Sequence, residues 1–264
     1  MTDLLLTHSY FLKFDPKEHR AMMPYPPLGT LYAAAHLIKN GYQVACFDSM
    51  LADSEQDILP LLGRHQPRIV VIYDDDFNYL TKMCLSRMRE AAFRMSRFAK
   101  DQGCTVIVHG SDPADHIEHY IEHGADFVIT GEGEVTLLEL VAKILNRNDV
   151  PPDTIHGIAY RPNGSVFRSD KRELMTDLDI LPFPARQLID TEQYRRLWKE
   201  HHGYFSMNMV TTRGCPFHCN WCAKPIYGQV YHSRSPENVV EEMLILKRDY
   251  RPDHIWFCDD IFGL

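Results

Sequence analysis

The stretch Arg68-Ile69-Val70-Val71-Ile72-Tyr73 sets the fold class of this chain. It is a continuous apolar run, rich in β-branched residues, with no alternation of polar side chains. Such a run is typical of a strand that is buried on both faces, as in a parallel sheet covered by helices. Similar runs alternate with helical patterns over residues 1–150. We therefore predict an α/β fold whose N-terminal part is a doubly wound, Rossmann-like parallel sheet.

About five strand–helix units account for residues 1–150 on this interpretation. Strands are expected at residues 4–6, 42–47, 68–73, 105–108 and 126–129. Helices are expected at residues 31–40, 58–65, 81–101, 113–122 and 134–146. Ligands of such sheets bind beyond the carboxyl ends of the strands. We therefore look for binding residues at the polar and glycine-containing strand ends, which are Asp48, Tyr73, residues 109–111 and residues 131–133.

Composition restricts the possible classes of protein. The 264 residues carry 28 Lys and Arg against 36 Asp and Glu, a formal net charge of −8, which argues against nonspecific binding of nucleic acid. Hydrophobic residues make up 45% and charged residues 24%, which excludes a disordered or fibrous chain. The first residues have no basic n-region and too short an apolar stretch for a signal peptide, and no apolar run reaches the roughly 18 residues of a membrane-spanning helix. We expect a cytoplasmic protein without a transmembrane segment.

The second half of the chain has a different texture. Residues 151–205 are interpreted as a hairpin, with a turn at Pro162-Asn163-Gly164, followed by a Pro-rich connector. Residues 206–264 are interpreted as a second unit. It contains a strand at 207–210, a cysteine-rich loop, a helix over 236–250 and a strand at 255–257.

The cysteine-rich loop is the most informative stretch. Three of the seven cysteines form the pattern Cys215-x3-Cys219-x2-Cys222, directly after an expected strand and before an expected helix. An odd and clustered set of cysteines suits a reducing compartment and a metal site better than disulfides. Three thiolates on one loop can hold three corners of a cuboidal iron–sulfur cluster, which leaves the fourth iron open to a small molecule. Gly214 and Pro216 suit a tight loop.

Two other chemistries compete for these cysteines. A structural zinc site needs four ligands, and His218 or Cys258 are the available candidates for the fourth. Zinc sites usually add a distant second pair of cysteines, however, and the sequence has no such pair. A redox C-x-x-C at Cys219 and Cys222 leaves Cys215 without a role. The spacing therefore favours the cluster.

The wider motif Thr211-Thr212-Arg213-Gly214-Cys215-Pro216-Phe217-His218-Cys219-Asn220-Trp221-Cys222 resembles the signature of the radical S-adenosylmethionine (radical SAM) superfamily. Four further stretches are similar to the branch of that superfamily with an N-terminal cobalamin-binding domain. They are Pro26-Pro27-Leu28-Gly29, Gly131-Glu132-Gly133-Glu134, Leu181-Pro182-Phe183-Pro184-Ala185-Arg186, and residues 231–242, which begin Tyr231-His232-Ser233-Arg234. The resemblance covers essentially the whole chain.

The resemblance implies a set of cofactors and a reaction. In this family three cysteines, here Cys215, Cys219 and Cys222, hold a 4Fe-4S cluster, and S-adenosylmethionine chelates the fourth iron. An electron from a donor such as flavodoxin or ferredoxin then leads to reductive cleavage of S-adenosylmethionine and a 5′-deoxyadenosyl radical. The cofactors carry this chemistry and the protein positions them. The implied outcome is radical methylation that depends on cobalamin (vitamin B12), or a cyclisation or rearrangement, of a small or lipid-like metabolite.

The same resemblance assigns further residues to cofactors. Trp221 is expected near the cluster and the adenine. Asp259 and Asp260 follow a barrel strand and are expected to face the cofactor, the alternative being a solvated loop. Candidate contacts to cobalamin lie at the strand ends, and for residues 131–133 the alternative is a plain turn from strand to helix. These cobalamin candidates are Gly110, Ser111, Gly131, Glu132 and Gly133.

The chain departs from the family pattern at one loop. Cobalamin domains that bind cobalt through histidine carry D-x-H-x-x-G after the second strand. The matching loop here is Asp48-Ser49-Met50-Leu51-Ala52-Asp53, with Met50 in place of the histidine and Asp53 in place of the glycine. We therefore expect cobalamin to bind without an imidazole ligand from this loop.

Two other polar groups are expected to be structural. His116, His119 and His123 have helical spacing and are interpreted as a solvated helix face rather than a metal site. The triplet Asp74-Asp75-Asp76 is interpreted as a turn after a strand rather than a cation site.

Rival functions are a radical methylthiotransferase and a cobalamin- or metal-binding module that senses rather than catalyses. The first needs a further cluster-binding domain with three cysteines, and Cys46, Cys84 and Cys104 are too scattered to form one. An eightfold barrel takes roughly 250 residues, whereas only about 60 follow the connector. We therefore expect residues 206–264 to be an incomplete N-terminal part of the radical SAM (β/α) partial barrel, and the chain alone to be an incomplete catalytic unit.

Overall fold

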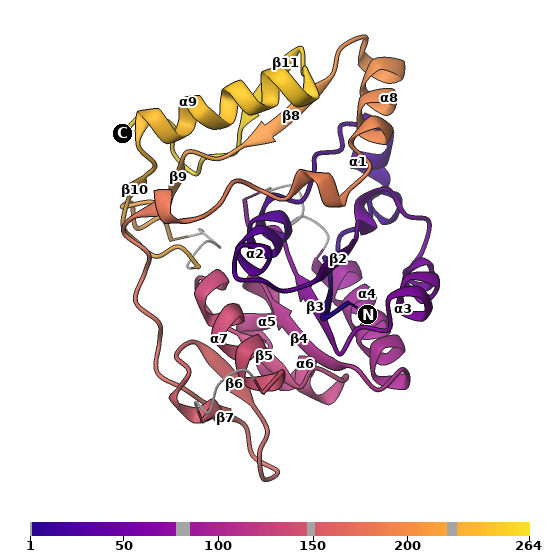
Figure 1. Ribbon diagram of the computed structural model, residues 1–264, viewed down its shortest axis with the longest axis vertical. Coiled ribbons are helices and arrows are strands. Elements are labelled where there is room, and N and C mark those ends of the chain that lie inside the picture. The colour runs from indigo at the N-terminus through magenta and orange to yellow at the C-terminus, as the bar shows by residue number, and fades with distance from the viewer. Residues whose placement is uncertain (1, 78–84, 147–150, 221–225) are drawn as a thin grey trace.

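The structure, a computed structural model, describes residues 2–77, 85–146, 151–220 and 226–264 (Figure 1). Its largest sheet, which we call the first sheet, has seven strands in the order β2-β1-β3-β4-β5-β6-β7. The strands are β1 Leu4–Thr7, β2 Val44–Phe47, β3 Ile69–Tyr73, β4 Thr105–His109, β5 Phe127–Ile129, β6 Ile158–Tyr160 and β7 Phe167–Arg168. The first five are parallel, and β6 and β7 are antiparallel. The predicted α/β class is therefore confirmed, with a mostly parallel sheet.

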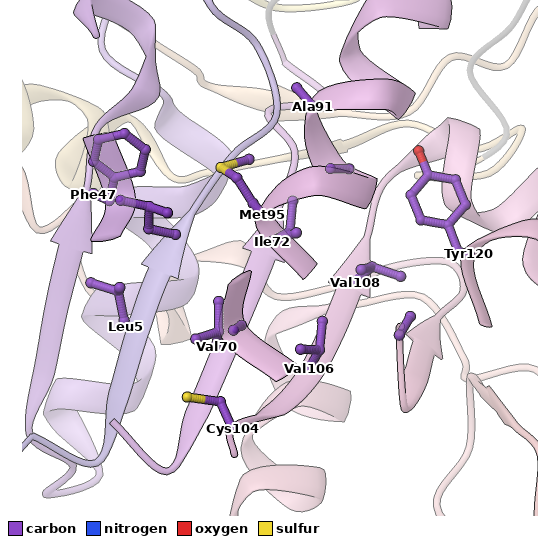
Figure 2. Packing of buried hydrophobic residues seen from close by; sticks show 14 of the residues in the cluster. Leu5, Phe47, Val70, Ile72, Ala91, Met95, Cys104, Val106, Val108 and Tyr120 are labelled. Atoms are coloured by element: carbon purple, nitrogen blue, oxygen red, sulfur yellow. The ribbon is translucent and has the colours of Figure 1, made fainter. Parts of the chain in front are cut away.

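Helices cover both faces of this sheet. The helices α2 Leu28–Lys39 and α7 Glu134–Ile144 pack on one face, and α3 Leu59–His65, α4 Leu85–Asp101 and α6 Ile117–Glu122 pack on the other (Figure 1). Figure 2 shows Val70 and Ile72 on the side of Ala91 and Met95 from α4. The alternate residues of β3, which are Ile69, Val71 and Tyr73, belong to the hydrophobic cluster on the opposite face of the sheet. The strand is therefore buried on both faces, as its apolar run predicts.

Several local predictions differ from the structure. The helix expected over 113–122 is divided at His116 into α5 Ser111–Asp115 and α6. The helices α1 Pro16–Ala21 and α8 Thr191–His202 were not predicted. The sequence does contain a signal for α8, because Asp190 caps its first turn and Gly203 ends it with φ +77°. Short 3-10 helices lie at Leu12–Phe14, Ser49–Leu51, Glu55–Ile58, Pro152–Thr154, Leu178–Ile180 and Arg186–Leu188.

The C-terminal part forms a smaller α/β unit beside the first sheet (Figure 1). Its strand β8 Ser206–Met209 pairs in parallel with β11 His254–Phe257, and β9 Thr212–Arg213 pairs antiparallel with β10 His232–Ser233. Ser235 is the N-cap residue of helix α9 Pro236–Ile245, and its hydroxyl accepts a hydrogen bond from the Asn238 amide. The helix continues as a π-helical turn over Leu246–Tyr250. The helix predicted over 236–250 is thus present, with a widened last turn.

An apolar cluster joins the two parts. The Trp198 ring of α8 is 1% exposed, and its Nε1 donates to the Pro24 carbonyl at 2.7 Å. The Tyr25 ring lies 5.1 Å from that of Trp198 and 4.6 Å from that of Trp256. The predicted hairpin is part of the first sheet, because β6 pairs with β5. The domain boundaries at 150 and 205 stay predictions.

No helix in the described ranges is both long enough and apolar enough to cross a membrane.

Candidate functional site

Two of the three predicted cluster ligands lie on one loop, which connects β9 to β10. The pairs Arg213 with His232 and Thr212 with Ser233 close the base of this loop. Cys215 follows β9 after one intervening glycine and is half-buried, whereas Cys219 is exposed, and both are free thiols. Trp221 and Cys222 lie outside the described residues.

Gly214 fixes the backbone at the entry to the cysteine loop. Its φ is +80°, and a Cβ atom there would lie 2.2 Å from the Val230 carbonyl oxygen and 2.7 Å from that of Tyr227. Both neighbours are backbone atoms at the far end of the same loop, so they have little freedom to move aside. The tight loop predicted from this glycine is therefore present.

Arg213, the residue before this glycine, connects the cysteine loop to the first sheet. Its Nη2 donates to Glu134 at 2.6 Å and its Nη1 to Glu132 at 3.1 Å. All three side chains are 6% exposed or less. Burial opposes ionisation of Glu134, but the Arg213 guanidinium outweighs it and lowers the pKa of that carboxyl. Burial raises the pKa of Glu132 despite the same partner, so Glu134 is the principal counter-ion.

The turn after β5 contains three of the predicted cobalamin contacts. Gly133 packs closely, since a Cβ there would lie 2.5 Å from the Tyr73 hydroxyl and 2.8 Å from the His109 ring. Glu132 accepts from the Met175 amide as well as from Arg213. Gly131 has φ +75°, and within the described part of the chain no atom beyond this glycine and its two chain neighbours lies within 4 Å of the position that a Cβ would take. Gly131 is therefore the glycine of this turn that borders open space.

His109 lies beside this turn at the end of β4. Its ring stacks on Tyr73 with centroids 3.9 Å apart, and its Nε2 donates to the Gly131 carbonyl at 2.9 Å. Burial lowers the pKa of His109, so the ring is neutral near pH 7. It therefore fixes the turn and is not a charged site.

The other two cobalamin candidates begin the neighbouring connection. Gly110 is buried with φ +145°, and a Cβ there would lie 3.0 Å from that of Asp74. Ser111 is half-buried and begins α5. The structure therefore brings both residues to the same sheet edge as residues 131–133, since β4 and β5 are adjacent and parallel.

The acidic triplet lies after β3, as predicted, but it is buried. The Asp74 carboxylate accepts from the Ser9 amide at 2.8 Å. The Asp75 carboxylate accepts from the amides of Gly29 and Phe77 at 3.1 and 3.2 Å. Burial raises the pKa of both carboxyls to about 6. These groups hold the ends of β1 and α2 against β3.

The loop at residues 48–53 carries Met50 at the position of the family's histidine. Met50 is 2% exposed and packs in the apolar cluster that contains Tyr10 and Leu12. The neighbouring His8 is also engaged: its Nε2 lies 3.1 Å from the Asp48 carboxylate and its Nδ1 lies 3.2 Å from the Ser49 hydroxyl.

Asp259 is not a solvated acid. It follows β11, and its carboxylate accepts from the amides of Thr211 and Thr212 at 2.6 and 2.9 Å, and also from the Thr211 hydroxyl. It therefore fixes the connection that leads from β8 into the cysteine loop. Asp260 is half-buried next to it. Contact of either residue with a cofactor stays a prediction.

The remaining polar groups behave as structural or surface residues. His116 and His119 are exposed, and the His123 ring stacks on Phe93 at 3.9 Å. Within the described ranges, which do not include Cys222, no group of three His, Cys, Asp or Glu is arranged to hold a metal ion. Cys46 lies on β2 and Cys104 just before β4, while Cys84 lies outside the described residues.

A second buried ion cluster escaped the sequence prediction. Glu242 of α9 is fully buried and pairs with Arg186 at 2.8 Å and with Arg234. Arg186 also donates to the Asn208 carbonyl at 3.0 Å, and Arg234 to that of Val210 at 2.7 Å. Both arginines lie in motifs that carry the family resemblance, but only the fold reveals their shared partner.

Comparisons with curated proteins find relatives whose descriptions name methyltransferases and a cyclase. It is 29% identical over 247 residues to an uncharacterized methyltransferase of Pyrococcus horikoshii, covering 90% of this chain and 50% of the relative. It is 25% identical over 233 residues to the anaerobic magnesium-protoporphyrin IX monomethyl ester cyclase of Synechocystis sp., covering 85% and 43%. The chain thus spans about half the length of these relatives. No family model matches it.

Solved structures with the same fold include two radical enzymes. The radical S-adenosylmethionine methyltransferase TsrM from Kitasatospora setae, with cobalamin and a [4Fe-4S] cluster bound, matches with a TM-score of 0.70 and 18% identity, over 98% of this chain and 48% of that one. The cobalamin-dependent S-adenosylmethionine radical enzyme OxsB matches with a TM-score of 0.69 and 20% identity, over 99% and 34%. These neighbours, with the curated methyltransferases and cyclase, confirm that the chain resembles the cobalamin-dependent radical S-adenosylmethionine enzymes.

Proposed function

We propose that the chain is part of a radical SAM enzyme that uses a 4Fe-4S cluster and cobalamin. The observation that carries this proposal is the cysteine loop, which contains the free Cys215 and Cys219 thiols and is fastened to the carboxyl-end edge of the first sheet through Arg213. In this proposal residues 1–150 are the cobalamin-binding, Rossmann-like domain, residues 151–205 the connector, and residues 206–264 the N-terminal part of the partial barrel. The parallel unit β8–α9–β11 supports the last assignment.

The donor set fits an iron–sulfur cluster. Thiolates are the ligands that such clusters prefer. Cys215 and Cys219 are free thiols on one loop, the first half-buried and the second exposed. Cys222 is proposed as the third ligand, and Trp221 as the residue beside the adenine of S-adenosylmethionine. A bound cluster would supply the electron for reductive cleavage of S-adenosylmethionine. The proposed electron donor to it is a flavodoxin or ferredoxin.

Cobalamin is proposed to lie against the edge formed by Gly110, Ser111 and residues 131–133. Gly131 supports this because the space beside it is open among the described residues. A pocket of about 430 Å³ also borders this turn, and its lining includes Glu132 and Lys171. Because Met50 stands in place of the histidine and is buried, cobalt would receive no imidazole ligand from the loop at 48–53. The proposed reaction is methylation, or a carbon-skeleton rearrangement, of a small or lipid-like metabolite.

The cluster is tested by anaerobic reconstitution of the full chain. We expect the wild type to take up iron and sulfide and to show the brown 4Fe-4S absorbance, and the Cys215→Ala variant to lose it. Cys46→Ala, which removes a half-buried thiol from β2, is the matched control and should keep the absorbance. A full 4Fe-4S spectrum in Cys215→Ala would show that the ligand assignment is wrong.

Two further measurements separate the rivals. Reductive formation of 5′-deoxyadenosine, with the cluster intact, is expected of a protein that contains this chain, and its absence would favour a module that senses rather than catalyses. Titration of the full chain with cobalamin is expected to give binding without the spectrum of an imidazole-ligated cobalt. A histidine-ligated spectrum would contradict the assignment at Met50.

A further inference from the structure

The guanidinium of Arg213 is the point at which two sequence motifs meet. One is the Thr-Arg-Gly-Cys entry to the cysteine loop, and the other is the Gly-Glu-Gly-Glu turn after β5. The two motifs are distant in the chain, with sequence separations of 79 and 81 residues, yet Arg213 contacts both Glu132 and Glu134 of the turn. We propose that Arg213 is a positioning residue that sets the cysteine loop in a fixed place relative to the carboxyl-end edge of the first sheet. This inference rests on the proposed function.

Aromatic rings enclose the guanidinium from three parts of the chain. Its carbon lies 5.0 Å from the ring centre of Tyr227, 5.3 Å from that of Phe77 and 5.9 Å from that of Tyr32. These rings belong to the cysteine loop, the connection after β3 and helix α2, respectively. A planar guanidinium held between rings and paired with two carboxylates has few alternative orientations. An ammonium group in its place could not form the same fork.

The restraint passes directly to the first proposed ligand. Only Gly214 separates Arg213 from Cys215, and that glycine is held at φ +80° against the carbonyl oxygens of two loop residues. On the other side, Glu134 is the first residue of α7, and Gly133 before it packs against the β3 and β4 ends. Arg213 thus joins two rigid backbone turns, one that leads to the cluster and one at the proposed cobalamin edge. Figure 1 shows the β9–β10 region facing the ends of α2 and α7.

This arrangement makes a specific prediction about distance. If Arg213 sets the relative position of the two edges, weakening its pairs should change the separation of the two cofactors without emptying the cluster site. The matched pair of variants is Arg213→Lys, which keeps the charge but loses the fork, and Glu134→Gln, which keeps the shape but loses the charge. Lys100→Gln is the control, because Lys100 pairs with Asp126 just before the amino end of β5, at the opposite end of the strands from the cysteine loop.

The test uses the full chain, reconstituted anaerobically, reduced with dithionite and loaded with cob(II)alamin. The magnetic coupling between the reduced cluster and Co(II) is measured by electron paramagnetic resonance. We expect Arg213→Lys and Glu134→Gln to keep the iron content of the wild type but to change this coupling, and Lys100→Gln to leave it unchanged. Coupling identical to the wild type in both test variants would overturn the proposal.

A second readout needs no cofactor. In the cluster-free chain, the rate of alkylation of half-buried Cys215 reports how firmly the loop is held, and exposed Cys219 serves as the internal reference. We expect Arg213→Lys to raise the Cys215 rate by about tenfold, with the Cys219 rate and the far-UV circular dichroism unchanged. An unchanged Cys215 rate would overturn the inference. Failure of the wild type to bind a cluster would instead contradict the proposed function and leave this second readout decisive.

Discussion

Single residues in this molecule are constrained most strongly where backbones approach one another. Gly214 and Gly203 have nearly the same φ, +80° and +77°, but different surroundings. Gly203 ends α8 with open space around it in the described part of the chain, whereas a side chain at Gly214 would collide with two carbonyl oxygens. Comparing alanine substitutions at these two glycines therefore separates the free-energy cost of a left-handed backbone from that of a steric clash.

We predict that Gly214→Ala disrupts the cysteine loop. The Gly203→Ala control should cost about 1–2 kcal/mol of unfolding free energy, which is the ordinary cost of the left-handed region. Gly214→Ala should cost more than that and should lower the iron content after reconstitution, because the loop must shift to admit the methyl group. Chemical denaturation and iron analysis measure both effects. Equal costs for the two variants, with full iron content in both, would contradict this explanation.

The burial of Asp75 is not evident from the sequence, which predicts a turn at this position. Burial raises the pKa of its carboxyl from 3.8 to about 6, against the opposing effect of the amide donors from Gly29 and Phe77 and of nearby His8. The neighbouring Asp76 adds to the increase. A raised pKa means that the folded state prefers the neutral carboxyl. Its contribution to stability is therefore full below pH 3.8 and is lost as the pH rises through about 6.

We predict that Asp75→Asn stabilises the fold at neutral pH. The amide keeps an acceptor for Gly29 and Phe77 but carries no charge. Relative to the wild type, the gain should be absent near pH 4 and reach on the order of 2 kcal/mol above pH 6. Urea denaturation at several pH values gives the measurement, with exposed Asp101→Asn as the control. A difference that does not change with pH would refute the assignment.

Elements of secondary structure depend on both local pattern and tertiary contact. The continuous apolar runs located β3 and β4 to within a residue, because strands buried on both faces need no polar positions. Helices α1 and α8 were missed, since α8 buries mainly Tyr194 and Trp198 and otherwise carries charged and polar residues. Its stability as a helix comes from that narrow buried stripe, which local propensity alone does not indicate.

Helix α9 is held by the buried Glu242 carboxylate. We predict that Glu242→Ala costs about 3–5 kcal/mol, because it leaves Arg186 and Arg234 buried without their counter-ion. Glu241→Ala, one residue away on the exposed side of the helix, should change the free energy of unfolding by less than about 0.5 kcal/mol. Thermal or urea unfolding distinguishes the two. Similar small effects for both would show that the buried cluster is not stabilising.

The whole molecule is held together by contacts between residues that are distant in sequence. The apolar cluster around Trp198 includes Tyr10 and Met50 from the first part and Met207 and Leu246 from the second. Arg213 adds a polar connection between the same parts. Because these contacts are buried, the two parts should unfold together rather than one after the other.

We predict that Trp198→Ala lowers the free energy of unfolding by about 3–5 kcal/mol and does so for both parts at once. Far-UV circular dichroism reports the secondary structure of the whole molecule, and tryptophan fluorescence reports Trp198, Trp221 and Trp256, which all follow residue 190. The unfolding transitions followed by these two signals should shift together. The exposed His201 of the same helix supplies the control variant His201→Ala. Separation of the two transitions in the wild type would contradict a single cooperative unit.

Local patterns of apolar residues, glycines and cysteine spacing were sufficient to predict the α/β class, the strands of the parallel sheet and the position of the cysteine motif. The resemblance to radical S-adenosylmethionine enzymes also rested on such patterns. The partners of the charged residues, in contrast, depend on the three-dimensional fold. Arg213 with Glu132 and Glu134, and Glu242 with Arg186 and Arg234, meet because the sheet and the connector bring distant segments together. A charged residue in a sequence is expected to be exposed, and only burial in a fold converts it into a specific contact with a defined partner.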